Sequence, residues 1–159
     1  MNRLFIFGTG AHARKVYHCA VGCGYRVVAF VDENLAAAAP IEGVALLGAA
    51  ALPLPAAGDC GFVAIGRADV RRRLMDWLNR LDWSLPALVH PAAWVAPDAR
   101  LGAGVLVAAG AVVETAAAIG RGAIVDIGVL VDHDCDVGAF CHLRPGEVLG
   151  PRTHVAAAA

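Results

Sequence analysis

Between residues 95 and 155 every sixth residue is aliphatic, without a break. A mostly small residue stands two places before each of these positions, and glycine follows at Gly102, Gly120 and Gly138, eighteen residues apart. Repeats of this length stack as a parallel β-helix, in which a hexapeptide supplies one short strand and a corner and three hexapeptides close a coil. Neither the 3.6-residue period of a helix nor the alternation of a hairpin sheet fits the pattern. The aliphatic positions are Val95, Leu101, Val107, Val113, Ile119, Val125, Val131, Val137, Leu143, Leu149 and Val155.

The pattern changes in the first ninety residues, where continuous apolar runs alternate with stretches of helical periodicity. Alternating strands and helices are typical of a small parallel α/β sheet. The second expected helix has one apolar face, formed by Val70, Leu74, Trp77, Leu78 and Leu81. We expect strands over residues 3–7, 25–31, 41–47, 61–65 and 85–89, and helices over residues 13–23 and 68–83.

The first expected strand ends in Gly8-Thr9-Gly10, where a parallel sheet of this kind binds phosphate. Glycine lets the backbone approach a ligand closely, and the N–H groups at the start of the following helix attract anions. Asp32 ends the second strand, where a carboxylate can bind a ribose hydroxyl. We therefore favour nucleotide binding over a glycine turn that only permits tight packing. An NAD enzyme fits less well, since no substrate domain with a hydride-transfer residue follows.

Arginines 71–73 lie in the first turns of the second expected helix. We expect a solvated helix face there. The alternative is that one of the three reaches a pyrophosphate from the neighbouring loop.

Composition narrows the class of protein. The net charge of −1 gives no basic field for nucleic acid. Hydrophobic residues make up 58% of the chain, but the most apolar stretch, residues 43–58, is too short to span a membrane and contains Pro53 and Pro55. No signal peptide is recognisable at the start. Five cysteines without framework spacing favour a reducing cytoplasm.

Reactive side chains concentrate in residues 132–136, which read Asp-His-Asp-Cys-Asp, and at His142. We expect His133 at an outward-facing corner of the coil, where a histidine flanked by carboxylates can act as a general base. One alternative is a surface histidine in a solvated acidic turn. Another is a metal site made of His133, Asp134, Cys135, Cys141 and His142, but both cysteines occupy inward positions of the repeat, so we expect no metal.

With these residues in place, the chain resembles bacterial sugar acyltransferases of the sialic-acid O-acetyltransferase and bacillosamine-pathway N-acetyltransferase type. The resemblance implies a Rossmann-like nucleotide-sugar-binding domain, residues 1–90, followed by a left-handed parallel β-helix acyltransferase domain, residues 91–159. It also implies a cytoplasmic homotrimer, with acetyl-CoA in the groove between adjacent β-helices. The matching segments are Leu4–His12, Phe30–Glu33, Ala64–Gly66, Leu88–Pro91, Val131–Cys135 and Phe140–His142.

The resemblance implies acetyl transfer to an amine or hydroxyl of a nucleotide sugar or a sialic-acid-like small molecule. His133 matches the general base, Asp134 the acidic residue that raises its basicity, and His142 a histidine near acetyl-CoA. Asp126 departs from the pattern, because the bacillosamine-type enzymes often carry asparagine there. The residues that match the nucleotide-sugar side are Gly8, Gly10, His12 and Asp32.

Members of this family usually continue for several more hexapeptides, whereas the aliphatic series here stops at Val155 before four alanines. We therefore expect a truncated β-helix. The alternative function is a non-catalytic nucleotide-sugar-binding or trimer-forming scaffold that lacks the donor site.

Overall fold

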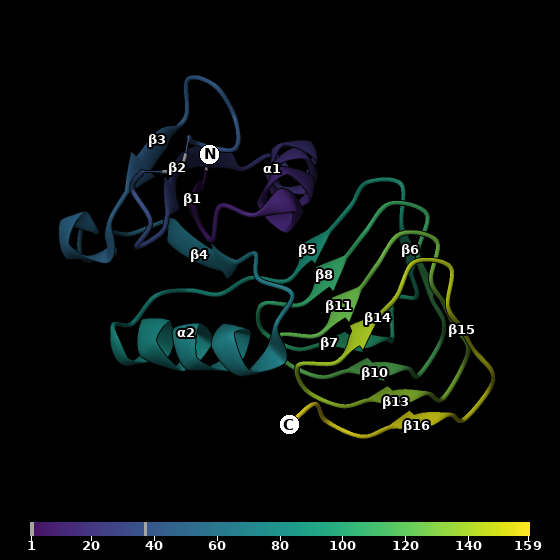
Figure 1. Cartoon of the computed structure of the whole chain (residues 1–159). Helices are drawn as coiled ribbons and strands as arrows, with labels where there is room; N and C mark the ends of the chain where they lie inside the picture. Colours follow the sequence, from purple (N-terminus) through teal and green to yellow (C-terminus); the bar gives the residue numbers. More distant parts are fainter. Residues whose placement is uncertain (1, 37) are drawn as a thin grey trace. The chain divides into compact units, whose positions relative to one another are not determined.

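The computed structural model describes residues 2–36 and 38–159. The chain divides into two compact units, Met1–Pro86 and Ala87–Ala159. Figure 1 shows the first unit as a small sheet with helices and the second as a stack of coils, coloured green to yellow.

The described part of the first unit contains one parallel sheet with the strand order β3-β2-β1-β4. Its central strands are apolar runs, and the residues of β1 after Arg3 are all buried. Helix α1 buries Ala13, Val16 and Ala20, and this spacing places one stripe of the helix against the sheet. The bounds are β1 Arg3–Phe7, α1 Ala11–Gly22, β2 Arg26–Val31, β3 Ala45–Leu47, the 3-10 helix η1 Ala49–Ala51, β4 Asp59–Val63 and α2 Ala68–Arg80.

The order of the strands fixes where a ligand can bind in this unit. From β1 the chain passes to β2 and β3 on one side of the sheet, and then returns to place β4 on the other side of β1. The connections therefore diverge at the carboxyl ends of β1 and β4. Open parallel sheets bind ligands in the crevice at this kind of switch point.

The second unit is a parallel β-helix. Its described strands form three sheets, ordered β16-β13-β10-β7, β14-β11-β8-β5 and β15-β12-β9-β6. Paired residues lie eighteen apart, as in Ile124↔His142 and Leu130↔Val148, so three hexapeptides make one coil, as predicted. The bounds are β5 Leu88–Val89, β6 Trp94–Val95, β7 Arg100–Leu101, β8 Leu106–Val107, β9 Val112–Val113, β10 Ala118–Ile119, β11 Ile124–Val125, β12 Leu130–Val131, β13 Asp136–Val137, β14 His142–Leu143, β15 Val148–Leu149 and β16 His154–Val155.

The aliphatic and the small positions of the repeat together fill the tube. Val113 and Ala111 are both fully buried, and the same holds for Val125 and Ala123. The glycines at intervals of eighteen have a steric cause. A Cβ on Gly120 would lie 2.5 Å from the amide nitrogen of Ala139, in the next coil. These positions therefore exclude every other residue type.

A second periodicity was not predicted. The corner residues 104, 110, 116, 122, 128, 134, 140, 146 and 152 all have positive φ. Glycine accepts this left-handed conformation readily, but Ala116, Asp134, Phe140 and Arg152 also adopt it here. The backbone of each corner is thus bent in the same way, whatever its side chain.

The strand expected over residues 85–89 does not belong to the α/β sheet. Leu88–Val89 is β5, and it pairs with β8 of the coil. Val89 stands six residues before Val95 and Ala87 two before Val89, so the repeat begins one hexapeptide earlier than the sequence analysis placed it. Among the described residues, no helix has the length and apolar character needed to cross a lipid bilayer.

Candidate active site

The His133 imidazole and the Asp134 carboxylate form a close pair on a corner of the coil. The corner follows β12, and Nδ1 of His133 lies 2.7 Å from Oδ2 of Asp134. The side chains are 39% and 53% exposed, so a substrate can reach the imidazole. When Nδ1–H donates to the carboxylate, Nε2 carries the lone pair. The arrangement has the geometry of a general base oriented by an acidic residue.

Backbone hydrogen bonds from the neighbouring coils fix this corner. The N–H of Asp134 donates to the carbonyl of Thr115, one coil earlier, and the carbonyl of His133 accepts from the N–H of Arg152, one coil later. The Asp132 carboxylate accepts from the N–H of His133 at 2.7 Å. The direction of the His133 side chain is therefore set by the fold on both sides.

The coil below His133 carries a polar contact of its own. Thr115 Oγ1 donates to Oδ2 of Asp98 at 2.6 Å, and the N–H of Ala116 donates to the same oxygen. The hydrogen bond from Thr115 lowers the pKa of the Asp98 carboxyl, with a smaller effect from the Ala116 amide. This contact ties together two layers of the corner on which His133 stands.

A second histidine–carboxylate pair lies on another part of the coil. Nε2 of His142, on β14, is 3.1 Å from Oδ2 of Asp126, in the corner after β11. Asp126 is only 3% exposed, and its Oδ1 accepts from the N–H of Ile127 at 2.8 Å. Sequence reasoning noted Asp126 only as a departure from a family pattern. The sequence feature that could have indicated the pair is the spacing of sixteen residues between Asp126 and His142. This spacing is two residues short of one coil, so it brings the two side chains together.

The two pairs lie on opposite edges of one sheet. His133 follows β12, a strand of the sheet β15-β12-β9-β6, whereas Asp126 precedes that strand and His142 belongs to the sheet β14-β11-β8-β5. Within this chain the fold thus separates the two histidines.

The cysteines of the alternative metal site point into the tube. Cys135 is 1% exposed and its thiol contacts the carbonyl of Gly150, while the Cys141 thiol contacts the carbonyl of Ala156. They do not converge with His133. Within residues 2–36 and 38–159 no group of three histidine, cysteine or acidic side chains has the arrangement of a metal site.

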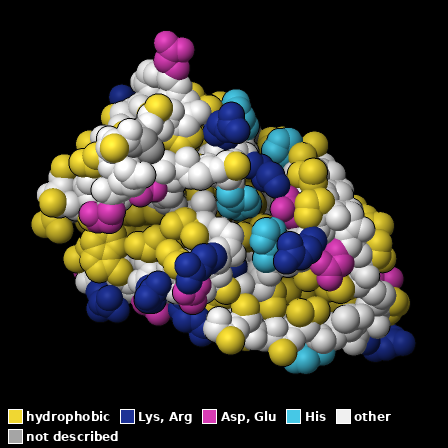
Figure 2. Space-filling model, in the orientation of Figure 1, with side chains coloured by type: hydrophobic (Ala, Val, Ile, Leu, Met, Phe, Trp, Pro, Cys, Tyr) yellow, Lys and Arg dark blue, Asp and Glu magenta, His cyan; other side chains and the backbone are white. Residues whose placement is uncertain are grey.

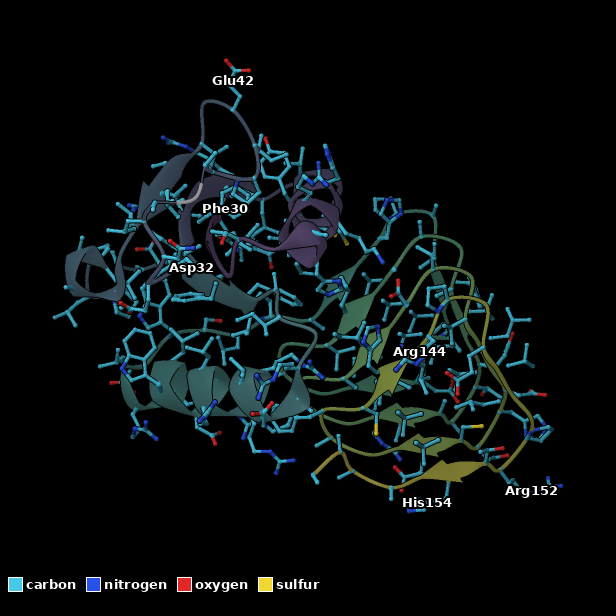
Figure 3. All side chains as sticks on the ribbon, in the orientation of Figure 1. Phe30, Asp32, Glu42, Arg144, Arg152 and His154 are labelled. Carbon is cyan, nitrogen blue, oxygen red and sulfur yellow. The ribbon has the colours of Figure 1, made fainter. Side chains whose placement is uncertain are left out.

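A cavity of about 330 Å³ opens in the first unit, at the carboxyl ends of the strands. Gly8, after β1, and Asp32, after β2, both line it. Oδ2 of Asp32 accepts from Thr9 Oγ1 at 2.7 Å, and Oδ1 accepts from the N–H of Asn34 at 3.0 Å. Figure 3 labels Asp32 at the end of its strand. The carboxylate is thereby held beside the glycine turn.

The apolar wall of the cavity comes partly from α2. Val70, Leu74 and Trp77, which were expected on one face of this helix, line the cavity together with Phe7. Figure 2 shows hydrophobic side chains gathered between η1 and α2, with acidic and basic side chains at their border. Two charged residues, Glu33 and Arg73, also line the cavity; sequence reasoning gave Glu33 no role there and offered arginines 71–73 only as an alternative contact to a pyrophosphate.

Gly10 and His12 occupy the start of α1. Gly10 is the N-cap residue and is exposed, and His12 lies in the first turn. Neither lines the cavity, so of the four residues assigned to the nucleotide-sugar side the structure brings Gly8 and Asp32 to it.

The expectation of a solvated face for arginines 71–73 is wrong for Arg71. Its side chain is 1% exposed, and its guanidinium donates to the carbonyls of Ile65 and Gly66 at 2.7 Å. These carbonyls belong to the turn between β4 and α2. A buried guanidinium satisfies carbonyl groups that would otherwise lose their hydrogen bonds to water.

One outward face of the coil is apolar. On the sheet β15-β12-β9-β6 the outward positions form a column, in which Trp94 is 55%, Leu130 43% and Val148 65% exposed. On the sheet β16-β13-β10-β7 the corresponding positions include Arg100, Asp136 and His154. Figure 3 shows His154 on the outside of the coil.

Comparisons with known proteins agree with this architecture. The family model of the PglD N-terminal domain matches residues 3–78. No curated protein sequence matches the chain.

Three solved structures share the fold. PerB from Caulobacter crescentus, in complex with CoA and GDP-perosamine, is 37% identical with a TM-score of 0.85, and the match covers 98% of this chain and 78% of that chain. The acetyltransferase domain of PglB from Neisseria gonorrhoeae, in complex with acetyl coenzyme A, is 28% identical with a TM-score of 0.86, covering 98% and 85%. WeeI from Acinetobacter baumannii, 19% identical with a TM-score of 0.84 over 96% and 74%, shares the fold alone. The fold is thus an α/β unit followed by a left-handed parallel β-helix.

Proposed function

The chain belongs to the hexapeptide-repeat sugar acyltransferases, and we propose that it transfers the acetyl group of acetyl-CoA to an amine of a nucleotide-linked sugar. The observation that carries the proposal is the contact of 2.7 Å between His133 Nδ1 and Asp134 Oδ2 on an accessible corner. PerB, the relative described above, is solved with CoA, the product that acetyl-CoA leaves after transfer, and with GDP-perosamine, a nucleotide-linked amino sugar.

In the proposed mechanism His133 is the general base. The sugar amine attacks the thioester carbonyl carbon, a C–N bond forms, and Nε2 of His133 takes a proton from the amine. The Asp134 carboxylate accepts a hydrogen bond from Nδ1–H of His133 and stabilises the imidazolium. The C–S bond then breaks, and the departing CoA thiolate receives a proton. General-base catalysis of this kind contributes about 10²- to 10⁴-fold to the rate.

His142 is assigned to the donor side, next to acetyl-CoA. Asp126 holds Nε2 of His142 at 3.1 Å, which fixes the orientation of the ring. Backbone N–H groups of the coil are suited to stabilise the oxyanion that forms on the thioester carbonyl.

The nucleotide of the acceptor is assigned to the first unit. Gly8 and Gly10 allow the backbone to approach a phosphate, with His12 in the first turn of α1 beside it. Asp32, at the end of β2, is assigned to the ribose, from which its carboxylate would accept a hydrogen bond of a hydroxyl group.

We propose a homotrimer as the working form. An exposed column of large apolar side chains on one sheet supports association, because such a surface is costly to leave in water. The His133–Asp134 and His142–Asp126 pairs lie on the two edges of that sheet. Association through it places groups from neighbouring chains beside one site. The absence of disulfide framework spacing among the five cysteines supports a cytoplasmic location.

The test is an acetyl-transfer assay on the purified chain, with acetyl-CoA as donor and GDP-perosamine or a UDP-linked amino sugar as acceptor. The proposal predicts a product with an N-acetyl group, detected by mass spectrometry, and equimolar release of CoA. The second candidate function, a nucleotide-sugar-binding scaffold, predicts acceptor binding by calorimetry without acetyl-CoA binding and without product. The observation that favours the scaffold is the cavity, because all of its lining residues belong to the first unit.

A further inference from the structure

We propose that the cavity of the first unit is selective for guanine, so that the acceptor is a sugar linked to GDP. The inference rests on the proposed function, since it names the nucleotide of that acceptor. It is carried by the lining side chains: an aromatic wall from Trp77 and Phe7, a carboxylate at Glu33 and a guanidinium at Arg73.

The cavity has separate places for the parts of a nucleotide. The start of α1, which follows the turn at Gly8 (φ +112°), provides backbone N–H groups for phosphate. The carboxylate of Asp32 is fixed by Thr9 and Asn34 beside that turn, at the place of a ribose. The base therefore falls in the remaining space of the 330 Å³ cavity, against α2.

An aromatic side chain is fixed in the wall where the base falls. The rings of Trp77 and Phe7 meet edge to face, with centroids 6.2 Å apart. This contact orients the indole, which belongs to the rigid helix α2. Bases stack on such a platform, and a bicyclic purine covers more of it than a pyrimidine does.

The two charged lining side chains are able to reach a ligand. Asp32 already accepts two hydrogen bonds, whereas Glu33 is an exposed carboxylate at the same rim. Arg73 is 73% exposed, and its Nη2 lies 3.7 Å from Oδ2 of Asp69. Asp69 is held more closely by Arg67, at 2.8 Å, so Arg73 can turn toward the cavity without leaving that carboxylate unpaired.

A carboxylate and a guanidinium together match guanine better than the other bases. Guanine presents N1–H and N2–H as adjacent donors for a carboxylate, and O6 and N7 as adjacent acceptors for a guanidinium. In uracil the single N3–H lies between two carbonyl oxygens, which repel a carboxylate. In adenine the N6 donor lies between two acceptors, so a carboxylate finds only one partner. A bidentate contact of this type discriminates between bases by about 10- to 100-fold.

The experiment measures the Kd of the full chain for GDP, UDP and ADP by calorimetry. We expect GDP to bind at least about tenfold more tightly than UDP and ADP. Glu33→Gln is expected to remove about tenfold of the GDP affinity while leaving UDP affinity within about twofold, and Arg73→Met to act in the same direction. Glu42→Gln and Arg80→Met, at exposed positions of the same unit, are the matched controls and should leave the Kd values for all three nucleotides unchanged.

Equal or tighter binding of UDP or ADP overturns the inference, as does a GDP preference that survives both variants, or no binding of any of the three. These failures are distinct from failure of the proposed function. Acetylation of a UDP-linked sugar would refute guanine selectivity and leave acetyl transfer standing. Selective GDP binding without any acetyl transfer would leave the cavity assignment standing and refute the proposed reaction.

Discussion

Asp126 holds His142 by a hydrogen bond of 3.1 Å between Oδ2 and Nε2, and the carboxylate is only 3% exposed. A buried carboxylate that contacts an imidazole nitrogen fixes the orientation of the ring. Asp126 stands where the bacillosamine-type acyltransferases that the chain resembles often carry asparagine. The coil therefore carries a histidine–carboxylate pair with a buried carboxylate besides the pair at His133, and sequence reasoning identified only the pair at His133.

Asp126→Asn tests whether this carboxylate supports the donor side. The variant keeps the shape of the side chain but replaces a charged acceptor by a neutral one. The difference between the two kinds of hydrogen bond is about 1 kcal/mol, so we expect KM for acetyl-CoA to rise about fivefold with a smaller effect on kcat. Steady-state kinetics measures both constants. Asp136→Asn is the control, because its contact of 3.2 Å with His154 is exposed to solvent; an equal effect of the two variants would contradict the assignment.

Leu130→Glu tests the proposed trimer. The side chain is 43% exposed at the centre of the apolar column, so a charge there costs the isolated chain little but is unfavourable in a buried contact. We expect sedimentation to change from trimer to monomer, with the far-ultraviolet circular dichroism preserved. Arg100→Glu, on the neighbouring polar sheet, should leave the assembly intact. A trimer that persists in Leu130→Glu would exclude this face as the contact.

Gly120→Ala tests the close packing of consecutive coils. A Cβ at this position would lie 2.5 Å from the nitrogen and 2.8 Å from the Cα of Ala139, and both are backbone atoms that cannot turn away. We expect the free energy of unfolding to fall by about 1–3 kcal/mol, measured by urea denaturation. Gly150→Ala is the matched control in the coil, because nothing lies within 4 Å of its added Cβ. Equal stability of the two variants would contradict the steric account.

Thr115→Val tests the contact below His133 through its pH dependence. The hydrogen bond from Thr115 lowers the pKa of Asp98 from its ordinary 3.8 in the folded state. A carboxyl with a lowered folded pKa contributes stability above its unfolded pKa, and this contribution is lost as the pH falls through the folded pKa. Wild type should therefore be more stable than the variant at neutral pH, and the difference should shrink below about pH 4. Urea denaturation at both pH values measures it, and a difference independent of pH would count against this contact.

The sequence predicted the coil because a tube buries one aliphatic side chain per strand, and burial leaves a period that can be counted. It did not predict the left-handed corner positions, because a positive φ at Ala116, Asp134 and Arg152 cannot be read from the residue type alone. The strand at Leu88–Val89 was assigned to the wrong sheet, although Ala87 and Val89 continue the period. The periodicity thus predicted the fold class correctly but placed the first hexapeptide of the repeat too late in the chain.

The candidate site was predictable only in part. His133 and Asp134 are adjacent in sequence, so their contact follows from a local corner. The contact between Asp126 and His142 depends on the register of two successive coils. The burial of Arg71 depends on carbonyl groups in the turn before α2, and the sequence does not show that these carbonyls need a side-chain donor. Contacts between distant segments depend on packing, and a single sequence carries little of that information.

The most direct test of the account is kcat for acetyl transfer in His133→Asn compared with wild type, with the nucleotide-sugar acceptor at saturation and its Kd measured separately. Asparagine cannot take the amine proton, so we predict a loss of about 10²- to 10⁴-fold in kcat with the acceptor Kd within about twofold. His154→Asn, on the exposed polar sheet, should retain full activity. A His133→Asn variant that turns over at the wild-type rate would show that His133 is not the base, and the proposed mechanism would be wrong.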